Sequence, residues 1–423
     1  MASSQAGNAN EGVFKKMRSC FNGRLTYAVF IIALSQVNFG LEQAVFNSTQ
    51  AMNSFTKKFG VYNPKKKSYQ LETYYLSLLS SLTYIGFAFG LVTGNILSAR
   101  IGRKKCFDVM CIYAIIGTLI CITTRTNKWQ MVVGRIVAYV YIGMELALVP
   151  VTQTELVPAP STLNLTVEKG KFMELFQGTN LERTLIVIGV NVFLQLTGQN
   201  FSSVYGTIFI KSIGIVNPFT MNAITTACSI TFVLLSQVLT DRTGRVPLMV
   251  VGALVQCGGL FTMGGLGTIA NPSYSEKAGI VAMVTEFSSG FAIGWAPLSH
   301  VVAAEIPTQH LRDMTYAVGS VFNIAIQFAV SLSFPFLLNE PYAALGSKVG
   351  FIFGTTAFMA VIFSLFGIPE CKGKSLEEID ELFLEGVPIR KFRTATSRHH
   401  LEVFEDMKDK ADVRIETRQA DRV

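Results

Sequence analysis

The residues best suited to binding chemistry in this sequence are neutral amides inside an apolar stretch. Residues 184–210, between Arg183 and Lys211, form an uncharged run of 27 residues, long enough to cross a ~30 Å hydrocarbon core as a helix. The segment FLQLTGQNFSSVYG, residues 193–206, lies within this run. Amides at bilayer depth are costly unless they find partners or line a wet cavity. This run carries four of them, at Asn191, Gln195, Gln199 and Asn200.

The spacing of these amides predicts a polar helix face for a neutral ligand. At ~100° per residue, one face collects Asn191, Gln195, Gly198, Gln199, Ser202 and Tyr205. In an ideal helix Asn200 lies ~140° from Gln195. Both can therefore contact one ligand only if the helix breaks near Gly198. The alternative for Gln195 and Asn200 is interhelical packing, because amides also cross-link membrane helices.

Composition indicates the kind of element that positions these amides. The chain has 423 residues, of which 50% are hydrophobic and 15% charged, and the apolar residues form long blocks. This pattern predicts a polytopic membrane protein. The net charge of +8 is concentrated in short connectors, which favours topology-setting loops over nucleic-acid binding. The seven cysteines show no disulfide or metal-ligand spacing.

The apolar blocks predict ten membrane spans, four before a polar segment and six after it. The first group covers about 25–46, 73–99, 109–124 and 131–151. The second covers about 184–210, 219–240, 247–269, 279–302, 315–338 and 349–369. We therefore divide the chain into a cytoplasmic tail at 1–23, an amino-terminal helical bundle at 24–160, a cytoplasmic linker at 161–183, a six-helix bundle at 184–369 and a cytoplasmic tail at 370–423, with a short helix at 375–384.

Charges inside the spans are the other candidates for function. Glu42 lies near the end of the first span, where either a solvated cap or a proton or substrate site explains it. Arg135 and Glu145 share the fourth span; opposite charges in one helix are expected to face a bundle interior and to pair. Asn47-Ser48-Thr49 is a glycosylation sequon if it lies in an external loop.

Two motifs occur twice. The turn at 99–103 is similar to the turn at 241–245, and the helix end at 150–155 is similar to the one at 297–305. Corresponding motifs in two halves suggest a duplicated transporter with its site at the interface between the halves. Basic turns of this kind can dock on acidic helix ends and hold one conformational state.

Taken together, these motifs resemble the sugar porter family of the major facilitator superfamily, particularly its fungal members. The matching segments are FGLEQA at 39–44, the two basic turns, GR at 134–135, PVTQTELVP at 150–158, QLTGQN at 195–200, GWAPLSHVVAAEIP at 294–307 and PECKGKSLEEID at 369–380. The resemblance covers about residues 25–160 and 172–383. It implies an all-α membrane protein, a helical bundle of the major facilitator superfamily.

The resemblance also implies roles for single residues. Substrate binding would fall to Gln195, Gln199, Asn200, Asn323 and His300. Proton coupling would involve Glu42 with Arg135, for which a structural ion pair is the alternative. A gating charge network would comprise Arg100, Arg103, Glu155, Asp241, Arg242, Arg245, Glu305 and Arg312.

The chain departs from the family pattern at three places. The usual Asp of the first basic turn is Ala99, and Leu194 and His300 replace other pocket residues. The pattern also breaks off at Pro160 and resumes near Glu168, so the fifth and sixth family helices are missing. We therefore expect about ten transmembrane helices, arranged as four and six, instead of twelve.

These observations predict a transporter and no enzyme. No nucleophile, metal cluster or phosphate loop suggests catalysis, and no cofactor is expected. The expected activity is alternating-access transport of a sugar, hexose-like or a related carbohydrate or polyol, coupled to protons. The expected location is the plasma membrane, with both termini cytoplasmic and no nucleic-acid partner. The alternatives are a truncated, non-transporting isoform or gene model, and a sugar sensor or regulatory partner.

Overall fold

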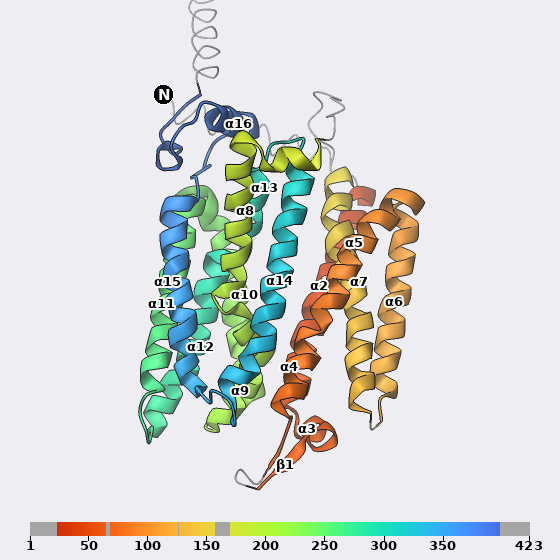
Figure 1. The fold of residues 1–423 in the computed structure, drawn as a ribbon, viewed down its shortest axis with the longest axis vertical. Coiled ribbons are helices and arrows are strands. Elements are labelled where there is room, and N and C mark those ends of the chain that lie inside the picture. The colour runs from red at the N-terminus through yellow and green to blue at the C-terminus, as the bar shows by residue number, and fades with distance from the viewer. Residues whose placement is uncertain (1–22, 65–67, 126, 157–169, 398–423) are drawn as a thin grey trace, which may run out of the picture. The chain divides into compact units, whose positions relative to one another are not determined.

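The computed structural model describes residues 23–64, 68–125, 127–156 and 170–397 (Figure 1). The predicted amino-terminal tail, most of the predicted linker and the end of the predicted carboxyl-terminal tail lie outside these residues. The chain divides into two units. The first comprises Met1–Thr166, Ser203–Ile208 and Ser331–Phe336, and the second comprises Val167–Ser202, Phe209–Val330 and Leu337–Val423.

The first unit is built from helices and one small hairpin. Its elements are α2 (Gly23–Ala51), α3 (Asn53–Phe59), β1 (Val61–Asn63), β2 (Ser68–Gln70), α4 (Thr73–Ser81), α5 (Thr83–Ile101), α6 (Arg103–Thr123) and α7 (Lys128–Leu156). The strands pair antiparallel, with Tyr62 opposite Tyr69. Helix α7 packs along both α5 and α6. This contact with α5 is close, because a Cβ added to Gly143 of α7 would lie 2.0 Å from the carbonyl oxygen of Phe87.

All regular elements of the second unit within its described residues are helical. Its elements are a 3₁₀ turn (Phe172–Phe176), α8 (Gly178–Leu196), a π-helical turn (Phe201–Tyr205), α9 (Gly206–Ile213), α10 (Pro218–Thr243), α11 (Arg245–Leu266), α12 (Tyr274–Ile293), α13 (Trp295–Glu305), α14 (Arg312–Leu338), α15 (Val349–Gly367) and α16 (Leu376–Leu384). The π-helical turn, α9 and α14 each contain residues that cluster with the first unit. Within the second unit, α11 packs along α12 and α15.

Nine of the ten predicted membrane spans are found among the described residues. Among the described residues, nine helical segments are long and apolar enough to cross a membrane. They correspond to nine of the ten predicted spans, and the remaining one, the first, lies in α2, which is not among the nine. Helices are the expected solution in lipid because their backbone groups bond to one another where no water is available. The chain is therefore an all-α integral membrane protein.

Several boundaries differ from the prediction. Helix α6 begins at Arg103, six residues before its predicted start. The basic turn thus shrinks to Gly102, whose φ of 84° is readily adopted only by glycine. Helix α8 begins at Gly178, inside the predicted linker, because its Arg183 is buried against Asp380. The segment after the first span contains α3 and the hairpin, which the sequence did not predict.

The glycosylation interpretation of Asn47 was wrong. Asn47 belongs to α2, and its side chain is only 3% exposed. The apolar run of the first span ends near Phe46, but the helix continues to Ala51. This continuation brings the sequon into the helix.

The predicted short helix of the tail exists and is part of a core. Ser375 caps α16 by accepting a hydrogen bond from the amide of Glu378 at 3.1 Å. Leu382, Phe383 and Phe392 are buried in one hydrophobic cluster with residues of α8, α11, α13 and α15. The second unit therefore extends beyond Pro369, where the predicted six-helix bundle ends.

Candidate functional site

A chain of side-chain amides joins α8 to α14. Asn191 donates to the carbonyl of Val187 at 2.9 Å. The Asn191 oxygen accepts from Asn323 at 3.2 Å, and the Asn323 oxygen accepts from Gln195 at 3.2 Å. Gln195 is 8% exposed, and its Oε1 has no hydrogen-bond partner among the described residues. The chain thus fixes the amide of Gln195 and leaves one acceptor for a hydroxyl donor.

The helix that carries these amides breaks at Gly198. Such a break is required if Gln195 and Asn200 are to contact the same ligand. Helix α8 ends at Leu196, and Gly198 has φ 91°. A Cβ on Gly198 would also lie 2.8 Å from the ring of Phe353. Glycine is therefore required here both for backbone conformation and for space.

Beyond the break, Asn200 is held by the same helix that holds Gln195. Its amide nitrogen donates to the backbone carbonyl of Gln327 at 3.2 Å. Its amide oxygen accepts from the Gln327 side chain at 3.2 Å. Gln327 lies four residues after Asn323 on α14, so the two side chains share a helix face.

His300 reaches this face of α14 from α13. Its Nδ1 lies 3.2 Å from the hydroxyl of Tyr316, which precedes Asn323 by seven residues. The structure thus brings Gln195, Asn200 and His300 to α14, the helix of Asn323. Gln199 follows the break and is half-buried. Sequence reasoning missed Tyr316 and Gln327, although their spacing of seven before and four after Asn323 is a helical-face signal.

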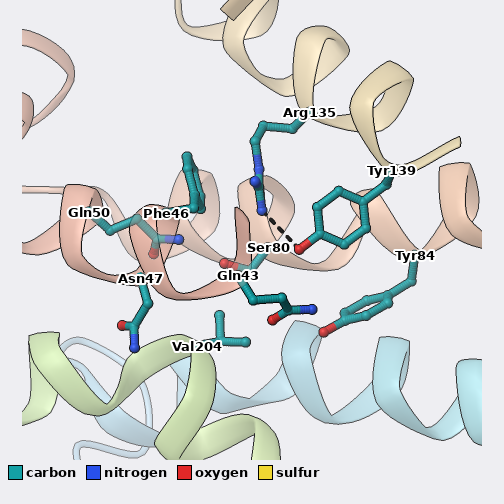
Figure 2. A pocket seen from close by; sticks show the side chains of 9 residues that line it. All are labelled: Gln43, Phe46, Asn47, Gln50, Ser80, Tyr84, Arg135, Tyr139 and Val204. Atoms are coloured by element: carbon teal, nitrogen blue, oxygen red, sulfur yellow. Dashed lines mark hydrogen bonds between the residues drawn. The ribbon is translucent and has the colours of Figure 1, made fainter. Parts of the chain in front are cut away.

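The predicted proton-coupling pair is an ion pair in the first unit. Arg135 Nη1 lies 3.2 Å from Glu42 Oε1, and Arg135 donates to the hydroxyl of Tyr139 at 3.1 Å (Figure 2). The guanidinium also lies over the ring of Phe46, 3.6 Å from its centroid. The Arg135 side chain is 7% exposed and that of Glu42 is 21% exposed. A buried cation thus has a partly accessible carboxylate as its partner, and Glu145 is not that partner.

Part of the predicted gating network assembles at the start of α11. Arg245 donates to Glu305 through Nη2 at 2.8 Å and through Nε at 3.3 Å. Glu370 accepts from the backbone amides of Arg245 at 3.1 Å and Val246 at 2.9 Å. A carboxylate at a helix amino terminus is favourable because it satisfies free amides and the helix dipole. Glu370, in the predicted PECKGK motif, is a residue that the predicted network did not include.

The other predicted gating residues do not meet in the same way. Arg103 donates to Ser98, one helix earlier. Arg100, Asp241 and Arg242 are exposed. Two buried nitrogens of Arg312, Nε and Nη2, have no hydrogen-bond partner in the part of the chain that the structure describes. The side chain of Glu155 lies outside the described residues.

The polar groups are not arranged for metal binding. No group of three or more His, Cys, Asp or Glu side chains that could hold a metal ion occurs within residues 23–64, 68–125, 127–156 and 170–397. Neutral amides lie in uncharged stretches of α8 and α14, and paired charges lie elsewhere. The amide chain of the second unit can hydrogen-bond a neutral polar molecule. The ion pair of the first unit can respond to the loss or gain of one charge.

Known proteins with similar sequences include transporters and, by name, a glucose sensor. A family model described as sugar (and other) transporter matches residues 28–167 and 161–383. The major facilitator-type transporter ecdD of Aspergillus rugulosus is 30% identical over 54% of this chain and 44% of its own length. The D-xylose-proton symporter of Escherichia coli is 29% identical over 47% of this chain and 41% of its own length. This chain thus matches less than half the length of these relatives.

Solved structures show the same fold. A crystal structure of a D-xylose-proton symporter superimposes with a TM-score of 0.66 at 19% sequence identity, covering 82% of this chain and 99% of that one. An inward-open structure of the xylose transporter XylE of E. coli gives a TM-score of 0.64 at 18% identity. The predicted fold, a major facilitator helical bundle, is thereby confirmed.

Proposed function

Because the chain belongs to the sugar (and other) transporter family, we propose that it transports a neutral sugar or related polyol across a membrane by alternating access. The similar proteins include permeases and symporters and are not enzymes by name. The domain division at 24–160 and 184–369, with cytoplasmic tails and a plasma-membrane location, is part of this proposal.

The observation that carries the proposal is the amide chain on α8 and α14. Asn323 holds Gln195 by a hydrogen bond at 3.2 Å, which leaves the buried Oε1 of Gln195 as an acceptor. A sugar hydroxyl can donate to this oxygen and accept from a neighbouring amide. Gln195, Gln199, Asn200, Asn323 and His300 are the proposed substrate-binding residues.

Proton coupling is proposed for the pair of Glu42 and Arg135. Protonation of Glu42 would remove the charge that balances a buried guanidinium, so the pair would separate more easily. Two protonation states that favour two conformations are what coupled alternating access requires. Gating is proposed for Arg245 and Glu305 together with Arg100, Arg103, Glu155, Asp241, Arg242 and Arg312.

Uptake of radiolabelled sugars in a transport-deficient yeast tests the proposal. We expect accumulation of at least one sugar, abolished by an uncoupler. Gln195→Leu should raise KM about tenfold, because a lost hydrogen bond in a buried site costs about 1–2 kcal/mol. Glu42→Gln should abolish accumulation against a gradient and leave exchange of sugar down its gradient.

A matched control separates these effects from general damage. Gln237 is an exposed amide on α10, and Gln237→Leu should leave KM unchanged. Absence of uptake for every sugar, despite surface delivery of the wild-type chain, would exclude transport. Uptake that is insensitive to both Glu42→Gln and the uncoupler would exclude proton coupling alone.

A further inference from the structure

The end of α2 carries a second set of neutral amides, in the first unit, whereas the α8 amide chain belongs to the second unit. Gln43, Asn47 and Gln50 are spaced by four and three residues, which places them on one face of a helix. Figure 2 shows all three lining one pocket, with Arg135 and Tyr139 of α7 across from them. This polar face had no role in the sequence prediction.

Several buried polar atoms around this pocket are unsatisfied. Asn47 is 3% exposed, Gln50 is 1% exposed and Arg135 is 6% exposed. Asn47 Oδ1, both amide atoms of Gln50 and Arg135 Nε have no hydrogen-bond partner among the described residues. Leaving one such group unpaired costs about 1–3 kcal/mol. Ser80 Oγ, which also lines the cavity, is likewise unsatisfied within the described part of the chain. Five such atoms beside one cavity indicate that something polar occupies it.

The size and chemistry of the pocket restrict its occupant. The cavity volume is about 10 Å³, which is room for about one water molecule. The residues that line it include no carboxylate, so it does not suit a cation. The single charge at its wall, Arg135, is already balanced by Glu42 at 3.2 Å, so an anion is not required. The unsatisfied atoms are both donors and acceptors, which a hydroxyl group can match at once.

We propose that this pocket binds one hydroxylic group, held by Asn47 and Gln50 beside Arg135. Two sources share this chemistry, a resident water molecule and one hydroxyl of a transported sugar. The second source rests on the proposed function, and the first does not. Either occupant would connect the α2 amides to the ion pair of Glu42 and Arg135.

The test uses the full chain, purified and reconstituted in lipid nanodiscs. Thermal unfolding midpoints are measured for wild type, Gln50→Leu, Asn47→Leu and the double variant. Each is measured without sugar and with D-glucose, D-xylose and singly deoxygenated D-glucoses. Thr49→Val is the matched control, since the Thr49 hydroxyl bonds to its own helix at Val45, at 2.7 Å, and does not line the pocket.

A resident water predicts that Gln50→Leu lowers the sugar-free midpoint relative to Thr49→Val. The double variant should then cost less than the sum of the single variants, because both side chains share one ligand. A sugar hydroxyl predicts an unchanged or raised sugar-free midpoint and at least tenfold weaker sugar binding. In that case one deoxy sugar should bind wild type and Gln50→Leu equally.

The proposal is overturned if Gln50→Leu leaves the sugar-free midpoint unchanged or raises it and also leaves sugar affinity unchanged. In an empty pocket, replacing an unpaired amide by an apolar group stabilises the folded protein. If no sugar raises the unfolding midpoint of the wild-type chain, the result contradicts the proposal that a sugar is the substrate. In that case the sugar-free midpoints still test the pocket proposal. A lowered midpoint of Gln50→Leu and a double variant that costs less than the sum of the single variants support it, and any other result overturns it.

Discussion

Two buried arginines are stabilised in the same way in the two units. Arg135 pairs with Glu42 and lies over Phe46. Arg183 pairs with Asp380 and lies over Phe383, 4.4 Å from the ring centroid. An aromatic ring and one carboxylate together offset the cost of removing a guanidinium from water. In each pair the arginine is the buried partner and the acid is the more exposed one.

This asymmetry predicts unequal costs of breaking the Arg183 pair. The Arg183 side chain is 2% exposed, whereas Asp380 is 31% exposed. Asp380→Ala leaves a buried charge unpaired and should cost about 3 kcal/mol, whereas Arg183→Met leaves a hydrated carboxylate and should cost about 1 kcal/mol. Unfolding midpoints of the purified variants in detergent check the order. A larger loss for Arg183→Met would show that packing on Phe383 outweighs the charge.

Cys371 is expected to be an unreactive thiol. Burial, with Glu305 and Glu370 nearby, raises the pKa of Cys371 to about 12. The thiolate is the reactive form, and its fraction therefore stays negligible from pH 7 to pH 9. Mass spectrometry should find slow maleimide labelling at both pH values.

The adjacent position supplies the control for this experiment. Lys372 is exposed, so Lys372→Cys in a Cys371→Ser background should label quickly and faster at pH 9, as an ordinary thiol does. Labelling of Cys371 that rises with pH in the same way would contradict the expected protonation state.

At the level of elements, the apolar runs were sufficient to predict helices but not their ends. The predicted boundaries differ most where a charged residue begins a helix, as Arg103 does for α6. Hydropathy assigns such charged residues to loops. In the structure a single glycine with positive φ, Gly102, separates α5 from α6, so Arg103 is already helical. The break at Gly198 meets the condition that the sequence set for Gln195 and Asn200 to contact one ligand.

The contacts of the site were predictable only in part. Gln195, Asn200 and Asn323 were identified by resemblance, but their partners were not, since hydrogen bonds between α8 and α14 depend on the rotation of both helices. Glu370 illustrates the same limit. Its role at the start of α11 joins residues that are 125 positions apart in the sequence, and local spacing carries no signal for that.

The break after α8 should be sensitive to a single methyl group. Gly198→Ala places a side chain at φ 91° and 2.8 Å from the Phe353 ring. The conformation alone costs about 1–2 kcal/mol, and sugar binding should weaken as Asn200 moves. Thermal unfolding and sugar titration of the purified variant measure both effects.

A second glycine controls for the added methyl group. Gly258 lies inside α11, and a Cβ there would meet nothing within 4 Å. Gly258→Ala should be neutral or stabilising by about 0.5–1 kcal/mol. Equal effects at the two positions would mean that Gly198 is not structurally required.

At the level of the whole molecule, the connection between α7 and α8 accounts for the number of spans. Helix α7 ends at Leu156 and the 3₁₀ turn begins at Phe172. Two membrane helices of about 20 residues each do not fit in this interval. Among the described residues, three helical segments that can cross a membrane precede this interval and six follow it, and α2 holds the predicted fourth span before it.

An even number of spans predicts that both termini lie on the same side of the membrane. Fluorescent proteins are fused to the amino and carboxyl termini, and sealed right-side-out vesicles are treated with protease. We expect the two fusions to behave alike, either both digested or both protected. The positive residues of the connectors favour the cytoplasmic side. Protection of one fusion and digestion of the other would mean that one predicted helix does not cross.

The packing of α16 has a consequence for biosynthesis. Leu382, Phe383 and Phe392 complete a core whose other residues come from helices synthesised earlier. While the ribosome is still adding these residues, Arg183 has no Asp380 to pair with, and the first turns of α8 are not yet covered by α16. The second unit thus cannot finish folding helix by helix as it leaves the translocon. It must wait for α16, a helix of nine residues that is too short to cross a membrane.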